Sequence, residues 1–143
     1  MNKNQIETYL KLTPEQRDSS FLIRDILLNN IFGNDTKKVL YYFGKDLADN
    51  FEFSSINDIM TIFQNLGLGQ ISLSKVKKDI YLFQIEGNEI SQRFNLDKKP
   101  EFALETGFLA KSISEAIERP AEGQFTVDDK KRTVSIMIQT IPQ

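Results

Sequence analysis

The spacing of the apolar residues changes at Gly69, and this change restricts the fold more than any other feature of the sequence. Before Gly69, apolar residues recur at helical spacing: Ile56, Ile59, Met60, Phe63 and Leu66. After it, apolar residues alternate with polar ones, as at Ile71 and Leu73. A chain with helical and then alternating spacing is expected to fold as an α+β domain.

The N-terminal half of the chain predicts three helices. The first covers residues 21–32, is apolar nearly all round, and ends at Gly33. The second covers residues 35–50, and the third begins at Ser55 and ends near Gly67. A surface helix has a single apolar stripe, so the first helix is expected to be covered on most sides, by its own core or by another subunit.

The rest of the chain predicts two hairpins with a helix between them. The first hairpin turns near residues 77–79, and the second runs from Phe125 through a polar turn to Ile138. The helix between them covers residues 101–118 and ends at Pro120. We therefore expect a four-stranded antiparallel sheet, made of two hairpins flanking a helix and packed with the N-terminal helices.

The domain organisation is expected to be simple, because the sequence has no repeat and no Pro/Gly/Ser-rich linker. Residues 20–141 are predicted to form a single α+β domain. Residues 1–19 form a polar lead-in, in which Thr13, Pro14 and Gln16 predict the start of a short helix.

The residue types that are missing exclude many activities. The 143 residues include no His and no Cys, which excludes a Ser-His-Asp triad, thiolate catalysis, disulfides and Cys- or His-bound metals. The net charge of −2 gives no field that favours nucleic acid. The polar first ten residues do not fit a signal peptide, and no apolar run approaches the roughly 20 residues of a membrane helix. We expect a cytoplasmic protein without a transmembrane segment.

Three stretches of the sequence resemble a known family. They are FLIRDILLNNIFGNDTKKVLYYFGKDLA at 21–48, GLG at 67–69 and FALETGFLAKSI at 102–113. Together they resemble the YslB-like family of Gram-positive bacteria, which is similar to the superfamily of four-vinyl-reductase domains and TRAPP trafficking subunits. The resemblance spans about residues 21–138.

The resemblance implies a TRAPP-subunit-like fold, also described as the NO-signalling and Golgi-transport ligand-binding fold, which is commonly dimeric. Several members of the superfamily hold a hydrophobic small molecule or acyl chain between helices and sheet, and others are scaffolds. This chain lacks the cysteine that carries a covalent acyl group and the Cys-rich motif of many four-vinyl-reductase domains. Covalent acylation is therefore excluded, and redox or metal sensing is not implied.

Two glycines within predicted helices, Gly44 and Gly107, are the most suggestive candidates. Glycine inside a helix costs about 1 kcal/mol relative to alanine, so a close approach is expected at both positions. The neighbour approaching the backbone is either a ligand in a tunnel or another helix. Next to them, Lys45 and Glu105 are either a partly buried ion pair or two unrelated surface charges.

The candidate ligand-binding residues are these two glycines and apolar residues at helical or strand spacing. They are Leu40, Phe43, Gly44, Met60, Phe63, Phe83, Gly107 and Phe108. Aromatic residues at such spacing either line a pocket or fill an ordinary core. The all-round apolar helix supplies the candidate dimer seam: Phe21, Leu22, Ile26 and Leu27.

The basic clusters have an ordinary and a functional interpretation. They lie at 75–78, 98–99 and 130–132 and are diluted by nearby aspartates. They are either solvated turns that protect sheet edges or a patch for an anionic membrane surface or an acidic partner.

The function expected from these observations is that of a non-enzymatic, homodimeric cytoplasmic domain. It would bind a hydrophobic small molecule or acyl chain non-covalently, with no cofactor, no metal and no nucleic acid. The alternative is a homodimeric protein-interaction scaffold with a filled core and no ligand. An enzyme using lysine and carboxylates is a third interpretation, for which the spacing identifies no catalytic cluster.

Overall fold

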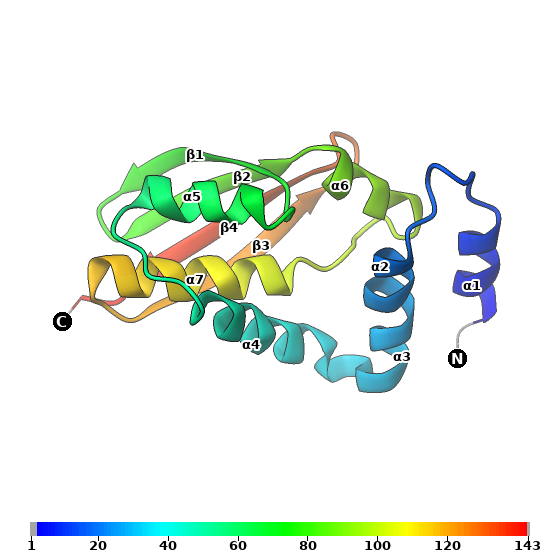
Figure 1. Ribbon diagram of the computed structural model, residues 1–143, viewed down its shortest axis with the longest axis horizontal. Coiled ribbons are helices and arrows are strands. Elements are labelled where there is room, and N and C mark those ends of the chain that lie inside the picture. The colour runs from blue at the N-terminus through cyan, green and yellow to red at the C-terminus, as the bar shows by residue number, and fades with distance from the viewer. Residues whose placement is uncertain (1–2, 143) are drawn as a thin grey trace.

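The computed structural model describes residues 3–142 and confirms the predicted α+β fold. Four strands form one antiparallel sheet in the order β1-β2-β4-β3. Their bounds are Gln70–Lys77 (β1), Ile80–Glu86 (β2), Ala121–Asp128 (β3) and Thr133–Thr140 (β4). Each hairpin pairs its own strands, and the hairpins join through β2 and β4. Strand β3 is therefore an edge strand (Figure 1).

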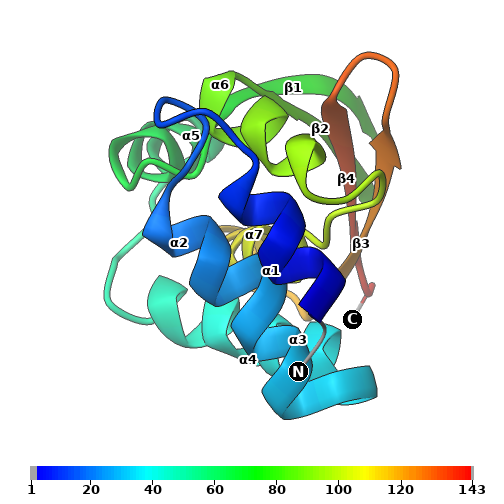
Figure 2. The ribbon, with the colours of Figure 1, turned by 90° about the vertical axis from the view of Figure 1, so that its right-hand side faces the viewer.

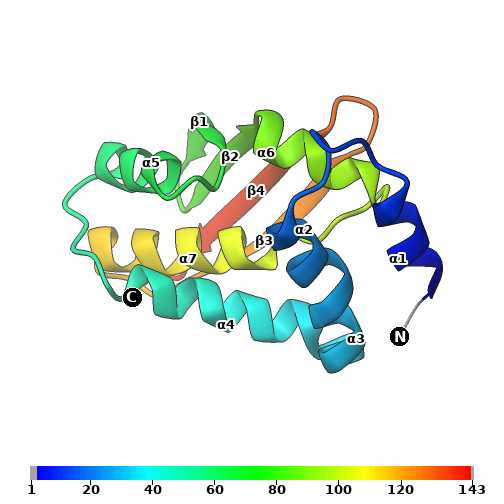
Figure 3. The same cartoon turned by 45° about the vertical axis from the view of Figure 1, so that its right-hand side comes forward.

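Helices cover one face of this sheet. The α-helices are α1 (Lys3–Leu10), α2 (Ser19–Phe21), α3 (Leu28–Phe32), α4 (Thr36–Ala48), α5 (Ile56–Asn65), α6 (Asn88–Ser91) and α7 (Ala103–Ile117). A π-helix, Leu22–Leu27, links α2 to α3, and 3₁₀ turns cover Gly33–Asp35 and Gln92–Asn95. Helix α7, which connects the hairpins, lies on the sheet, and α4 runs beside α7 (Figure 3). Helices α1 to α3 lie across one end of the molecule (Figure 2).

The predicted helix boundaries are confirmed for α4, α5 and α7, but the lead-in differs. Thr13 begins only a turn, in which the Thr13 amide donates to the Gln16 side chain and the Gln16 amide donates to the Thr13 carbonyl. The next helix begins at Ser19, where the Asp18 carboxylate accepts the Ser20 amide at 2.8 Å. Asp18 thus provides the N-cap that the sequence analysis assigned to Thr13. The helix predicted over residues 21–32 is present, with a π-helical middle.

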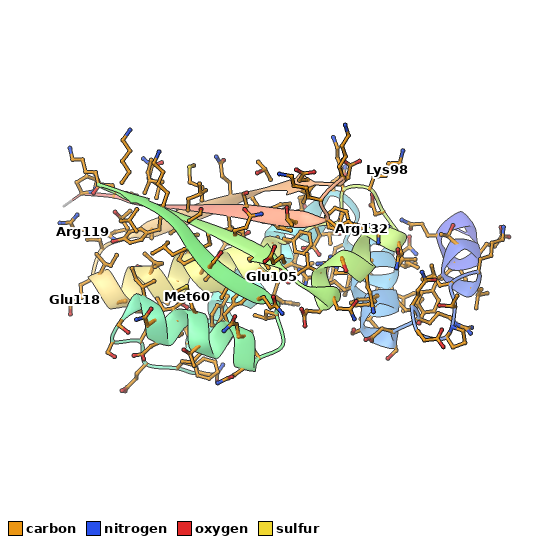
Figure 4. The ribbon with its side chains drawn as sticks, turned by 90° about the horizontal axis from the view of Figure 1, so that it is seen from above. Met60, Lys98, Glu105, Glu118, Arg119 and Arg132 are labelled. Carbon is orange, nitrogen blue, oxygen red and sulfur yellow. The ribbon has the colours of Figure 1, made fainter. Side chains whose placement is uncertain are left out.

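The core lies between the sheet and helices α5 and α7. Its sheet side consists of fully buried residues on one face of β2 and β4: Phe83, Ile85, Val134, Ile136 and Ile138. The opposite face of the sheet carries side chains that point away from the helices (Figure 4). Within residues 3–142, no helix combines the length and apolar character required to cross a bilayer.

Candidate functional site

Gly44 and Gly107 lie where α4 crosses α7. A Cβ atom on Gly44 would come within 2.0 Å of the Leu104 carbonyl oxygen, and one on Gly107 within 1.9 Å of the Tyr41 carbonyl oxygen. The two helix backbones therefore touch, and no side chain fits between them. The interpretation as a tight helix crossing is confirmed: the group that approaches each glycine is the other helix.

The predicted pair between Lys45 and Glu105 does not form. Lys45 turns to β3, where its Nζ lies 2.8 Å from Glu122 Oε1. Glu105 turns the other way and binds Arg24, with Arg24 Nη2 2.6 Å from Glu105 Oε1. Each side chain therefore pairs with a different element, Lys45 with β3 and Glu105 with the π-helix.

Most of the predicted pocket residues lie close together, but their side chains pack against one another in the core. Phe63, Phe83 and Phe108 are fully buried, and the rings of Phe63 and Phe108 lie 6.1 Å apart. Leu40 is also buried, and Met60 packs against the same core. Phe43 is 51% exposed, because it lies on the outer side of α4. Ligand contact by these residues remains a prediction.

The predicted dimer seam is partly covered by the chain itself. Phe21 and Ile26 are buried, and Leu22 and Leu27 are half-buried. The side chains that this segment leaves exposed are others, above all Ile31 at 72% exposure. Dimerisation through this helix remains a prediction.

A surface groove of about 440 Å³ lies between α4, the first turn of α7 and the edge strand β3. We call it the α4–β3 groove. It is lined by Lys37, Lys38, Tyr41, Ala103, Thr106, Glu122, Gly123, Gln124 and Phe125. Its volume lies in the range of small-molecule sites, roughly 300–1,000 Å³. A Cβ on Gly123 would come within 2.4 Å of Ile138 Cδ1 and 2.9 Å of Thr106 Cγ2, so bare backbone forms this part of the wall.

A hydrogen-bonded set of polar groups closes one end of the groove. The Tyr41 hydroxyl donates to one oxygen of Glu122 and accepts the Gly123 amide at 3.1 Å. Lys45 binds the other Glu122 oxygen and lies 4.8 Å from the centre of the Tyr41 ring. Burial and the hydrogen bond to Glu122 raise the pKa of Tyr41. Burial opposes ionisation of Glu122, but Lys45 and Tyr41 outweigh it and lower the pKa of Glu122.

A second polar feature lies inside the molecule at the first turn of α7. We call it the charged cluster: Arg24, Asp25, Arg93, Glu101 and Glu105. Figure 4 shows Glu105 in the interior. The Arg24 side chain, 17% exposed, binds Glu101 at 2.9 Å and Glu105 at 2.6 Å through its guanidinium. Arg93, which is buried, binds Asp25 at 2.6 Å and Glu101 at 3.1 Å.

The electrostatics of the charged cluster follow from burial and mutual pairing. Burial would lower the pKa of Arg24 and raise that of Glu101, but their attraction reverses both shifts. The pKa of Arg24 is therefore raised, and that of Glu101 lowered. For Asp25, burial dominates over Arg93 and raises the pKa. Within the described part of the chain, Arg93 Nη1 has no hydrogen-bond partner, and the guanidinium carbon lies 4.5 Å from the centre of the Phe102 ring.

Sequence analysis missed four members of the charged cluster and the groove. Arg24 and Asp25 do give a signal, because they are adjacent charges in a segment that is otherwise apolar nearly all round. Both lie in the π-helix, a conformation that is rare and frequent at functional sites. The groove gives no such signal, because its residues come from three elements that are far apart in the sequence.

Metal binding finds no support in the described range 3–142. No three of its His, Cys, Asp and Glu side chains lie close enough together to hold a metal ion. The carboxylates of the charged cluster are instead bound by arginine. Of the basic clusters, 130–132 forms the β3–β4 turn, where Arg132 donates to the Ser91 carbonyl at 3.1 Å.

Comparison with known proteins places the chain among uncharacterised relatives. The profile of a family described as "Protein of unknown function (DUF2507)" matches residues 19–139. The "Uncharacterized protein YslB" of Bacillus subtilis (strain 168) is 34% identical over 117 residues, which cover 82% of this chain and 78% of that protein. The predicted resemblance to the YslB-like family is confirmed.

Two solved structures share the fold. The phenol-responsive sensory domain of the transcription activator PoxR, solved with phenol, matches with a TM-score of 0.63 at 11% identity, over 85% of this chain and 73% of that one. A vinyl-4-reductase family protein from Methanocaldococcus jannaschii matches with a TM-score of 0.57 at 13% identity, over 98% and 90%. At these identities the likeness establishes the fold alone.

Proposed function

Since the chain belongs to the family described as "Protein of unknown function (DUF2507)", and since its fold matches a phenol-responsive sensory domain, we propose that it is a small-molecule-binding domain whose ligand lies in the α4–β3 groove. The observation that carries the proposal is the groove itself. It has the volume of a ligand site, apolar surface at Ala103 and Phe125, and polar groups that include the bonded pair Tyr41 and Glu122. Such a combination binds an apolar body and orients it.

The polar groups favour binding over catalysis. The Tyr41 hydroxyl is engaged with Glu122, and its raised pKa makes it a poor nucleophile or base near neutral pH. Glu122 is held as a carboxylate by Lys45. The carboxylates of the charged cluster are each bound by arginine and make no free acid–base pair. The proposed domain is therefore non-enzymatic, and its location in the cytoplasm stays a prediction.

The experiment is a binding screen by protein-observed NMR. Phenol and short aliphatic and aromatic compounds are titrated into the intact chain, and the amides of Ala103, Thr106 and Gly123 are followed. We expect saturable shifts at these amides and none at Ser72 on the far hairpin. Lys38→Trp, which places an indole at the mouth of the groove, should abolish the shifts. The matched variant Lys130→Trp in the β3–β4 turn should retain them. Shifts that survive in Lys38→Trp would place the ligand elsewhere.

A homodimeric scaffold is the second candidate, and the filled core favours it. The aromatic residues between sheet and helices pack on one another, as Phe63 and Phe108 do. On the outer side of α4, Tyr42 and Phe43 are more than half exposed and offer an apolar contact. Sedimentation equilibrium tests this candidate. A stable dimer that dissociates in Tyr42→Ser/Phe43→Ser, together with a silent binding screen, would favour the scaffold.

A further inference from the structure

We infer, resting on the binding function proposed above, that the α4–β3 groove takes an amphiphile with an apolar body and one carboxylate, and that Lys37 and Lys38 hold the carboxylate. This inference concerns the chemical class of the ligand. It comes from the charges along the groove and from the hydrogen bonds that its other polar groups already make.

The groove has more positive than negative charge. Its single carboxylate, Glu122, is bound by Lys45 at 2.8 Å and by the Tyr41 hydroxyl, so both oxygens are occupied. Lys37 and Lys38 also line the groove, and neither makes an ion pair with any residue in the described range 3–142. Two exposed ammonium groups are therefore left for an anion.

The remaining wall offers apolar contact and few free donors. The Thr106 hydroxyl donates to the Phe102 carbonyl at 2.7 Å, and the Gly123 amide donates to Tyr41. Phe125 and Ala103 contribute apolar surface. The ammonium of Lys37 lies 5.7 Å from the centre of the Phe125 ring, so the cation and the apolar wall are adjacent. A ligand with an apolar body on Phe125 can thus place an anionic head at Lys37.

The carboxylate is the head group that these features favour over a neutral hydroxyl. A hydroxyl at Lys37 and Lys38 would accept a hydrogen bond without opposite charge, whereas a carboxylate gains two charge-assisted hydrogen bonds. The lysines are exposed, so the gain is modest and is reduced by salt.

The test compares two probes that share an apolar body, 4-phenylbutyrate and 4-phenylbutan-1-ol. Dissociation constants are measured on the intact chain by NMR titration. We expect the carboxylate to bind roughly fivefold or more tightly than the alcohol at low ionic strength. The preference should vanish in Lys37→Met/Lys38→Met, which keeps the apolar stems, and in 0.5 M NaCl as a probe condition (about a 4 Å Debye length). Lys130→Met/Lys131→Met, in the β3–β4 turn, is the matched control and should keep the preference.

The outcomes separate the ligand class from the binding function. If the alcohol binds as tightly as the carboxylate, or if the preference persists in Lys37→Met/Lys38→Met, the carboxylate class is wrong while binding in the groove stands. If neither probe shifts the groove amides and the broad screen is also silent, the proposed function fails and takes this inference with it. Unchanged melting temperatures of both double variants show that the fold is intact.

Discussion

Helix α7 meets its neighbours through two unlike contacts, one at its first turn and one in the turn that follows. At the first turn, Glu105 and the preceding Glu101 enter the charged cluster, where four charged side chains are buried and Arg24 is largely buried. In the next turn, Gly107 lies against the backbone of α4 with no side chain in between. The first contact is made by charged side chains, and the second is made by two helix backbones.

The difference predicts which perturbations each contact tolerates. The glycine crossing involves no charge, so pH and salt should leave it unchanged, but any added atom must displace a helix. The charged cluster carries a desolvation cost that is offset only while every charge keeps its partners. Removing one partner should therefore be costly, whereas replacing a whole pair by apolar groups should be tolerated.

The largest effect is expected at the crossing. Gly107→Leu would place a side chain where the Tyr41 carbonyl oxygen already lies 1.9 Å from the Cβ position. Helix α4 would have to move, and we expect a loss of about 4 kcal/mol or more in the free energy of unfolding, or no folded protein. Circular dichroism with urea titration measures this. Glu115→Leu, at an exposed position of the same helix, is the matched control and should stay within about 0.5 kcal/mol of wild type. Equal stability of the two variants would contradict the close crossing.

The next effect is expected from breaking the charged cluster on one side. Arg93→Met leaves Asp25 buried without its main partner, and we expect a loss of about 3–5 kcal/mol. In the double variant Asp25→Leu/Arg93→Met the isolated charge is gone, so most of this loss should be recovered. Urea titrations of both variants decide. A double variant that is less stable than Arg93→Met would contradict this explanation. The loss in Arg93→Met would then not come from the buried, unpaired charge of Asp25.

A pH dependence is expected for the charged cluster but not for the crossing. Because the pKa of Glu101 is lower in the folded chain than its usual 4.5, its contribution is complete above that value and is lost as the pH falls through the folded pKa. Glu101→Gln should be less stable than wild type by about 1–3 kcal/mol at pH 7. This gap should shrink below pH 4.5. The raised pKa of Asp25 changes stability with pH in the opposite sense. Asp25 is present in both wild type and Glu101→Gln, so its contribution largely cancels in the difference between them. A gap independent of pH would contradict the assignment.

The same contrast explains how far the sequence predicted the molecule. The change of spacing at Gly69 predicted the sheet and its helices, because periodicity follows from local geometry. The two glycines predicted a close approach, because glycine inside a helix is costly without one. The charged cluster was missed because pairing depends on tertiary distance. Arg24 and Glu101 are 77 positions apart, and nothing local connects them. The groove was missed for the same reason.

The smallest effect is expected for the ion pair between Lys45 and Glu122, which carries the comparison to the surface. Glu122 is 61% exposed, so water screens the pair and competes for both groups. A double-mutant cycle with Lys45→Met and Glu122→Gln should give a coupling of less than about 1 kcal/mol. The same cycle on Arg24 and Glu105, whose side chains are largely buried, should give a larger coupling. If the exposed pair coupled as strongly as the buried one, burial would not be what distinguishes them. The Lys45–Glu122 pair beside the groove would then stabilise the fold as much as a pair of the charged cluster does.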